Sequence, residues 1–152
     1  MNTSTPLTVL LCLATATLSA ADETTISLAP AATQATELEE YTAPLSAMLN
    51  VVKQINEQLA SVKDEDSAEL AGEEIQGLLG ALNTHAETFS QQPALKPELE
   101  EQFMAWWAEQ EYIMEELVMH CERLQNEDPA FFGSQTLIAA IIMVGGVMGG
   151  AQ

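Results

Sequence analysis

Apolar residues recur at every third or fourth position, without an exception, between Leu38 and Val62. Because an α-helix makes one turn in about 3.6 residues, this spacing places them on one helical face. The pattern predicts an amphipathic helix whose apolar side packs against another element. The residues on this face are Leu38, Tyr41, Leu45, Met48, Val52, Ile55, Leu59 and Val62.

A second stretch repeats the same spacing after a short polar connection, which predicts an antiparallel helical hairpin. Its first half is small, with Ala68, Ala71 and the neighbouring Gly72, and this favours close approach to the first helix. Gly72, Gly77 and Gly80 each cost up to about 1 kcal/mol relative to alanine, so we expect the helix to depend on packing. The predicted face carries Ala68, Ala71, Ile75, Leu78, Leu82, His85 and Phe89.

The third stretch, Pro97 to Gln125, contains no glycine and no internal proline. Pro97 suits the first helical position, where its missing N–H would have no intrahelical partner. The apolar arc of this helix is wide enough to contact two neighbours, so we predict that it lies at the centre of a bundle. Gln110 falls within the arc, where a buried amide would fix the helix register. The arc comprises Leu99, Phe103, Trp106, Trp107, Ile113, Met114, Leu117, Cys121 and Leu124.

Prolines and small polar residues predict where the helices begin. Pro44 is tolerated in a first turn but not deep inside a helix, so the first helix is expected to start firmly near Ala43, with Thr42 as its N-cap. Thr36 and Glu39 have the spacing of a capping box, so a short extra turn before Pro44 is the alternative. Asp66 is the expected cap of the second helix, and Asp64 is the alternative.

The N-terminal segment, residues 1–21, has the pattern of a secretory signal peptide. Its apolar run, Leu7 to Leu18, is too short to span a bilayer, and small residues precede a cleavage point before Asp22. The first six residues contain no lysine or arginine, so a buried N-terminal helix is the alternative interpretation. The predicted organisation is a signal peptide (1–21), a flexible leader (22–35), a helical bundle (36–128) and an apolar, glycine-rich C-terminal segment (129–152).

The C-terminal segment has two interpretations. No charged residue occurs from Ala130 to Ala151, which is nearly long enough to cross a bilayer. Four glycines have the small-xxx-small spacing of associating helices and mark a candidate anchor or self-association surface. We favour the first interpretation, a short apolar helix that closes the three-helix unit. The alternative is a membrane anchor at Ile138 to Val147, which is less favoured because no lysine or arginine follows it. The glycines are Gly145, Gly146, Gly149 and Gly150.

The charge of the chain restricts its partners. Lysine and arginine total 4 against 23 aspartate and glutamate residues, a formal net charge of −19. Such a surface repels phosphate backbones, so nucleic acid is not an expected partner. The expected partner is a basic protein or a second copy of the chain.

No catalytic, zinc, haem or phosphate-binding motif appears, so we expect neither a cofactor nor an enzyme. His85 and His120 are the only histidines, and the predicted hairpin places them far apart. A haem- or metal-binding bundle is the least favoured hypothesis, because Glu116 with His120 has the wrong spacing for a di-iron motif and no second copy exists.

Cys121 is the only cysteine left after signal cleavage. Its position within the apolar arc favours a buried, inert thiol. The alternative is an intermolecular disulfide, because an unpaired cysteine in an exported chain invites one.

The run V-K-D-E-D-S-A-E-L-A, Val62 to Ala71, resembles a recurrent pattern among small exported bacterial all-helical proteins of unknown function. The resemblance implies an exported helical hairpin and no particular activity. The residue patterns predict an all-α, up-down-up three-helix bundle closed by a short apolar C-terminal helix. The expected role is an exported, non-enzymatic binding or scaffold protein of the periplasm or the secreted fraction, or alternatively a membrane-tethered envelope protein.

Overall fold

The computed structural model describes residues 31–149, with side chains from Gln34 onward. The predicted signal peptide and residues 22–30 of the predicted leader lie outside this part of the chain. The all-α class is confirmed, because residues 31–149 form four α-helices joined by turns and two short 3₁₀ helices, without a strand. The elements are α2 (Ala31–Ser61), α3 (Glu65–Ser90), η1 (Pro97–Leu99), α4 (Glu100–Glu127), η2 (Phe131–Gly133) and α5 (Gln135–Gly149).

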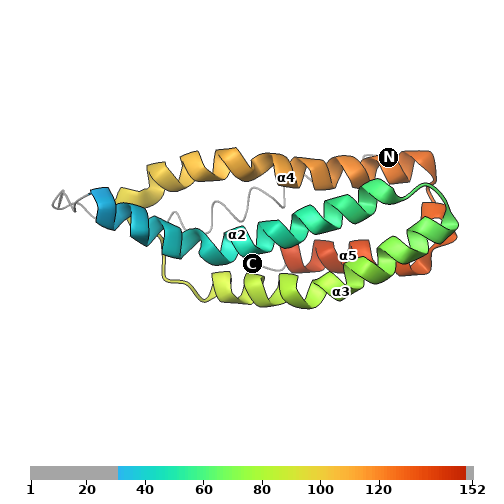
Figure 1. The fold of residues 1–152 in the computed structure, drawn as a ribbon, viewed down its shortest axis with the longest axis horizontal. Coiled ribbons are helices and arrows are strands. Elements are labelled where there is room, and N and C mark those ends of the chain that lie inside the picture. Colours follow the sequence, from blue (N-terminus) through green and yellow to red (C-terminus); the bar gives the residue numbers. More distant parts are fainter. Residues whose placement is uncertain (1–30, 150–152) are drawn as a thin grey trace.

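Each helix runs opposite to the one before it (Figure 1). Helix α2 packs along both α3 and α4, and α5 packs along α3. The prediction that the third stretch lies at the centre is therefore wrong, because α2 is the helix with two long partners. Helix α4 packs along α2, and Met114, Leu117 and Cys121 of its broad apolar arc line the cleft described below.

The central position of α2 explains its wide buried surface. The predicted face is confirmed, with Val52, Ile55 and Val62 fully buried. Leu49 and Val51 are buried as well, although they lie outside the predicted face. A helix between two neighbours buries more than one apolar stripe, and a single periodic pattern predicts only one.

Helix α2 begins at Ala31 and continues through Pro44, so the predicted start near Ala43 is wrong. Thr42 is not an N-cap; its hydroxyl donates to Leu38 O at 3.0 Å. Tertiary contacts hold the turns before the proline in place. The Tyr41 ring packs edge-on against Phe89 and Phe103, with centroids 5.9 and 5.8 Å away.

Helix α3 is capped by Asp64 and not by Asp66, so the alternative was correct. The Asp64 carboxylate accepts from Ser67 N at 2.9 Å, and the Ser67 hydroxyl accepts from Asp64 N at 3.0 Å. This reciprocal pair satisfies two N–H groups that the first helical turn leaves free. The predicted apolar face of α3 is confirmed, with Ala68, Ala71, Ile75 and Leu82 buried.

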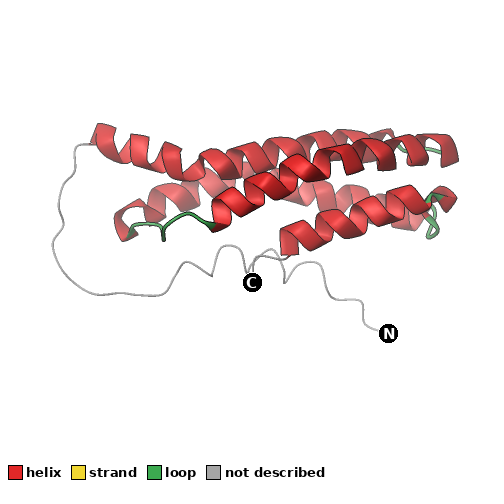
Figure 2. Cartoon of the chain, turned by 90° about the horizontal axis from the view of Figure 1, so that it is seen from below, coloured by secondary structure: helices red, strands yellow, loops and turns green. Residues whose placement is uncertain are grey.

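The C-terminal helix α5 has 15 residues, against 26 to 31 in the other three α-helices. It covers only the part of the bundle nearest the α2–α3 connection (Figure 2). Within residues 31–149, no helix has both the length and the hydropathy that a membrane crossing requires.

Candidate functional site

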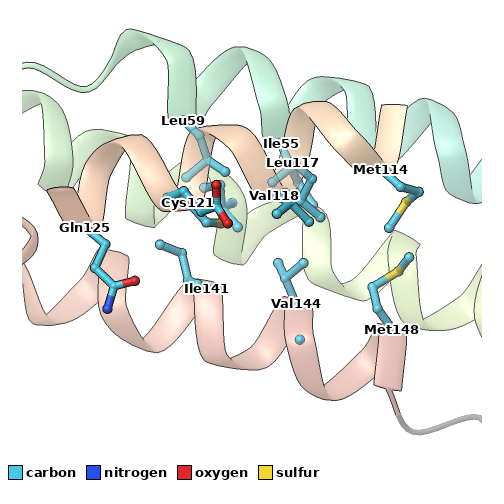
Figure 3. A pocket seen from close by; sticks show the side chains of 13 residues that line it. Ile55, Leu59, Met114, Leu117, Val118, Cys121, Gln125, Ile141, Val144 and Met148 are labelled. Carbon is cyan, nitrogen blue, oxygen red and sulfur yellow. The ribbon is translucent and has the colours of Figure 1, made fainter. Parts of the chain in front are cut away.

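An apolar cleft of about 400 Å³ lies between α4 and α5 (Figure 3). Its floor consists of Ile55 and Leu59 from α2 and Ile75 from α3, all of them almost fully buried. The cleft exists because α4 packs against α2 while α5 packs against α3. The two outer helices therefore face each other without close packing.

The α4 wall repeats the helical spacing of the sequence. Met114, Leu117 and Cys121 follow one another by three or four residues and line the cleft, with Val118 beside them. The side chains of Met114 and Met148 point toward one another from opposite walls at one end (Figure 3). Methionine is flexible and polarisable, so this end can adapt to apolar occupants of different shape.

The α5 wall is formed by Ile141, Val144, Gly145 and Met148. Gly145 is exposed, and a Cβ atom added to it would meet no atom within 4 Å. The cleft therefore widens at Gly145, and a larger side chain there has room to enter it. Two of the predicted candidate residues line this cleft, Gly145 on α5 and Cys121 on α4.

The other predicted glycines lie elsewhere. Gly146 is exposed with open space around it and does not line the cleft. Gly149 is half-buried, and Gly150 lies outside the described residues.

Cys121 is half-buried and is the free cysteine of residues 31–149. Burial, followed by the negative charge of Glu122, raises the pKa of the Cys121 thiol to about 11. The protonated thiol is the weaker nucleophile, so these surroundings favour the inert thiol. The intermolecular disulfide stays a prediction.

Close backbone contact fixes α5 on α3. A Cβ atom on Gly72 would lie 2.6 Å from Leu137 N and 2.7 Å from the carbonyl carbon of Thr136. Only glycine fits such an approach without a shift of one helix. The small residues in the first half of α3 were expected to allow close approach of the first helix. At Gly72 the helix that approaches closely is α5 instead.

Glu69 of α3 holds the start of α5. Its carboxylate accepts from the Ser134 hydroxyl at 2.7 Å and from the Thr136 hydroxyl. These two hydrogen bonds, that of Thr136 first, lower the pKa of Glu69. The Ser134 oxygen also accepts from Leu137 N at 3.0 Å, which satisfies an N–H of the first turn of α5.

The connection from α4 to α5 turns through residues with left-handed backbone. Phe131 and Phe132 have φ angles of 50° and 57°, which bulky residues rarely adopt. The Asp128 carboxylate accepts from Ala130 N and Phe132 N at 2.9 and 3.1 Å, and both phenylalanines pack against the core. The predicted stretch, Pro97 to Gln125, stops two residues before the end of α4 at Glu127, but the pattern did not predict this turn.

The buried amide of the bundle is Asn56 and not Gln110, which is only half-buried. Asn56 Nδ2 donates to Ile113 O at 2.9 Å and approaches Glu116 Oε2 at 3.4 Å. The prediction that Gln110 is the buried amide is therefore wrong, and Asn56 is the buried amide that joins two helices. Position 56 lies beside the apolar face of α2, so its polarity was a usable signal.

His85 and His120 lie on different helices, α3 and α4. In the described part of the chain, no group of three histidine, cysteine, aspartate or glutamate residues is arranged to hold a metal ion.

Comparison of the chain with protein-family models, with curated proteins and with solved structures gives no match. The resemblance of Val62 to Ala71 to small exported helical proteins stays a prediction.

Proposed function

We propose that this chain is an exported, non-enzymatic binding module that holds an apolar ligand between α4 and α5. In this proposal residues 36–128 act as a three-helix unit, and the apolar C-terminal helix closes it incompletely. The observation that carries the proposal is the apolar cleft of about 400 Å³. Ligand sites in proteins are typically hollows of about 300–1,000 Å³ lined mostly by apolar side chains.

The physical basis of binding is the removal of apolar surface from water, worth about 25 cal/mol per Å². The cleft floor is pre-formed, because Ile55, Leu59 and Ile75 are fixed by the core. A pre-formed site lowers the ordering cost of binding. Export remains an inference from the pattern of residues 1–21, and intact-mass measurement of the native protein tests the cleavage before Asp22.

The test compares two neighbouring glycines of α5. Gly145→Phe places a ring in the cleft, whereas Gly146→Phe places the same ring on the outer surface. The neutral dye N-phenylnaphthylamine reports apolar sites by its fluorescence. We expect saturable binding to the native chain, a loss of affinity of about tenfold or more in Gly145→Phe, and little change in Gly146→Phe.

Both substitutions remove a helical glycine, so their effects on helix propensity match. Equal affinity of the two variants, or dye binding that never saturates, would contradict the proposal.

Self-association through α5 is the second candidate. Ile142 is 68% exposed and Met143 is 43% exposed on a helix without charged residues. Ile142→Glu would then lower the oligomeric state in sedimentation equilibrium, and a native chain that is monomeric at high concentration would dismiss this candidate.

A basic protein partner, favoured by the net charge of −19, is the third. Its binding would weaken steeply as salt rises.

Membrane tethering predicts retention in the membrane pellet after carbonate extraction, and release into the supernatant would count against it.

A further inference from the structure

We propose that the cleft prefers an amphiphile with one alkyl chain and a cationic head group, such as a quaternary ammonium. This inference rests on the proposed function, because it names the class of ligand that the cleft would hold. It depends on the shape of the cleft, on the two polar residues at its rim, and on the positions of all the cations in the chain.

The cleft is elongated along α4. It extends from Met114 to Gln125, which corresponds to about 16 Å at 1.5 Å per residue. One end is closed in by the two methionines, and Gln125 lies at the other end, beyond Ile141 (Figure 3). A single extended dodecyl chain suits this length, with its methyl end at Met114 and Met148.

The polar lining is confined to the C-terminal part of α4. Glu122 and Gln125 are exposed, and the other side chains that line the cleft are apolar or a protonated thiol. A head group at this rim would meet a carboxylate and an amide. The last turn of α4 also carries the negative end of the helix dipole, which favours a cation.

The cations of the chain, four lysine and arginine residues, do not line the cleft. Lys96 pairs with Glu37 at 2.7 Å, Lys53 lies 5.8 Å from the ring centroid of Tyr112, and Lys63 is exposed in the α2–α3 connection. An anionic head group at the rim would therefore find no lysine to pair with.

Arg123 is adjacent to Glu122 in the sequence but is directed to α2. Its Nη2 donates to Leu59 O at 2.8 Å, and its Nη1 donates to Glu127 Oε2 at 2.7 Å. The guanidinium thus binds a carbonyl in the last turn of α2 that also accepts from Val62 N at 3.3 Å, and Glu127 offsets its charge. Within residues 31–149 Glu122 has no such partner, so its charge stays available to a ligand.

The experiment uses three amphiphiles with the same dodecyl chain, each below its micelle concentration. Dodecyltrimethylammonium, dodecyl maltoside and dodecyl sulfate compete with bound N-phenylnaphthylamine on the full chain. We expect the cation to bind about tenfold more tightly than the neutral maltoside at low salt, and the sulfate to compete most weakly.

Two variants separate a local contact from the general field of an acidic protein. Glu122→Gln should lower the affinity for the cation several-fold and leave the maltoside unchanged. Glu115→Gln is the control, because Glu115 is exposed on the same helix and does not line the cleft. Gly145→Phe should abolish binding of the cation measured directly by titration calorimetry, which excludes adsorption elsewhere on the surface.

Equal affinities for the three head groups would overturn this inference and leave the apolar binding site standing. Equal losses in Glu122→Gln and Glu115→Gln would also overturn it. Calorimetric binding of the cation that Gly145→Phe does not change would contradict the proposed function itself.

Discussion

Asn56 ties α2 to α4 inside the core. It is 2% exposed, and its amide nitrogen donates to Ile113 O across the interface. Its Oδ1 is buried and has no hydrogen-bond partner among residues 31–149. A buried amide is costly unless it is hydrogen-bonded, so this residue couples the register of two helices to their stability.

Asn56→Asp tests that coupling. The substitution removes the donor and places a carboxylate near Glu116, so we expect a loss of about 2–4 kcal/mol in the free energy of unfolding at pH 7. Burial and Glu116 would raise the folded pKa of the new carboxyl, so the loss should shrink as the pH falls below that raised value. Urea unfolding at pH 7 and pH 4.5 measures both effects. The control is Asn50→Asp on the exposed side of α2, which should cost little at either pH.

Cys121 gives a second prediction at this scale. Its pKa of about 11, against an ordinary value of 9.0, leaves about 100 times less thiolate at pH 8. The higher basicity recovers about tenfold in nucleophilicity, so alkylation by iodoacetamide should be about tenfold slower than in urea. Because the pKa of the thiol is higher in the folded state, its contribution to the free energy of unfolding is fully present below pH 9. This contribution is lost as the pH rises toward 11. The mass of the peptide that carries Cys121 follows the reaction, and an equal rate in urea would contradict burial of the thiol.

At the scale of the elements, the position of α5 follows from one missing Cβ atom. Gly72 lets the backbone of α5 approach α3 at Leu137, and Glu69 holds the first turn by two hydroxyl groups. The width of the cleft depends on this contact, since α5 has no comparable contact with α4.

Gly72→Ala should therefore destabilise the bundle by about 1–3 kcal/mol, because backbone and not a flexible side chain blocks the new methyl group. Gly77→Ala is the matched control on the same helix, where a Cβ atom meets nothing within 4 Å. That variant should gain up to about 1 kcal/mol from helix propensity. Urea unfolding compares the two, and a stabilised Gly72→Ala would refute the close approach of α5.

The helices and their apolar faces could be predicted, because periodicity depends only on residues a few positions apart. The buried positions Val52, Ile55, Ile75 and Leu82 all lie on predicted faces. The start of α2 could not be predicted, because contacts of Tyr41 with two distant rings outweigh the local cost of Pro44.

At the scale of the whole molecule, a net charge of −19 is spread over a narrow bundle. Within residues 31–149 only two ion pairs form, Lys96 with Glu37 and Arg123 with Glu127. Repulsion between carboxylates therefore outweighs attraction, and self-repulsion destabilises a compact state.

We expect the melting temperature to rise as sodium chloride increases from low to physiological ionic strength. Salt screens exposed charges beyond a Debye length of about 8 Å at 0.15 M, so it relieves repulsion more than it weakens two surface pairs. Differential scanning calorimetry measures the shift. Lys96→Gln removes an attractive pair and should keep the same salt dependence, whereas a melting temperature that falls with salt would contradict dominant repulsion.

The sequence by itself determined the helices, their apolar faces and the acidity of the surface, since spacing and composition are local properties. It did not decide which helix is central, which helix packs closely at Gly72, or that Gly145 and Cys121 line the same cleft. Those features depend on how helices of unequal length and width pack together. Because α4 leans on α2 and α5 leans on α3, the packing leaves a cleft that no single helix encodes.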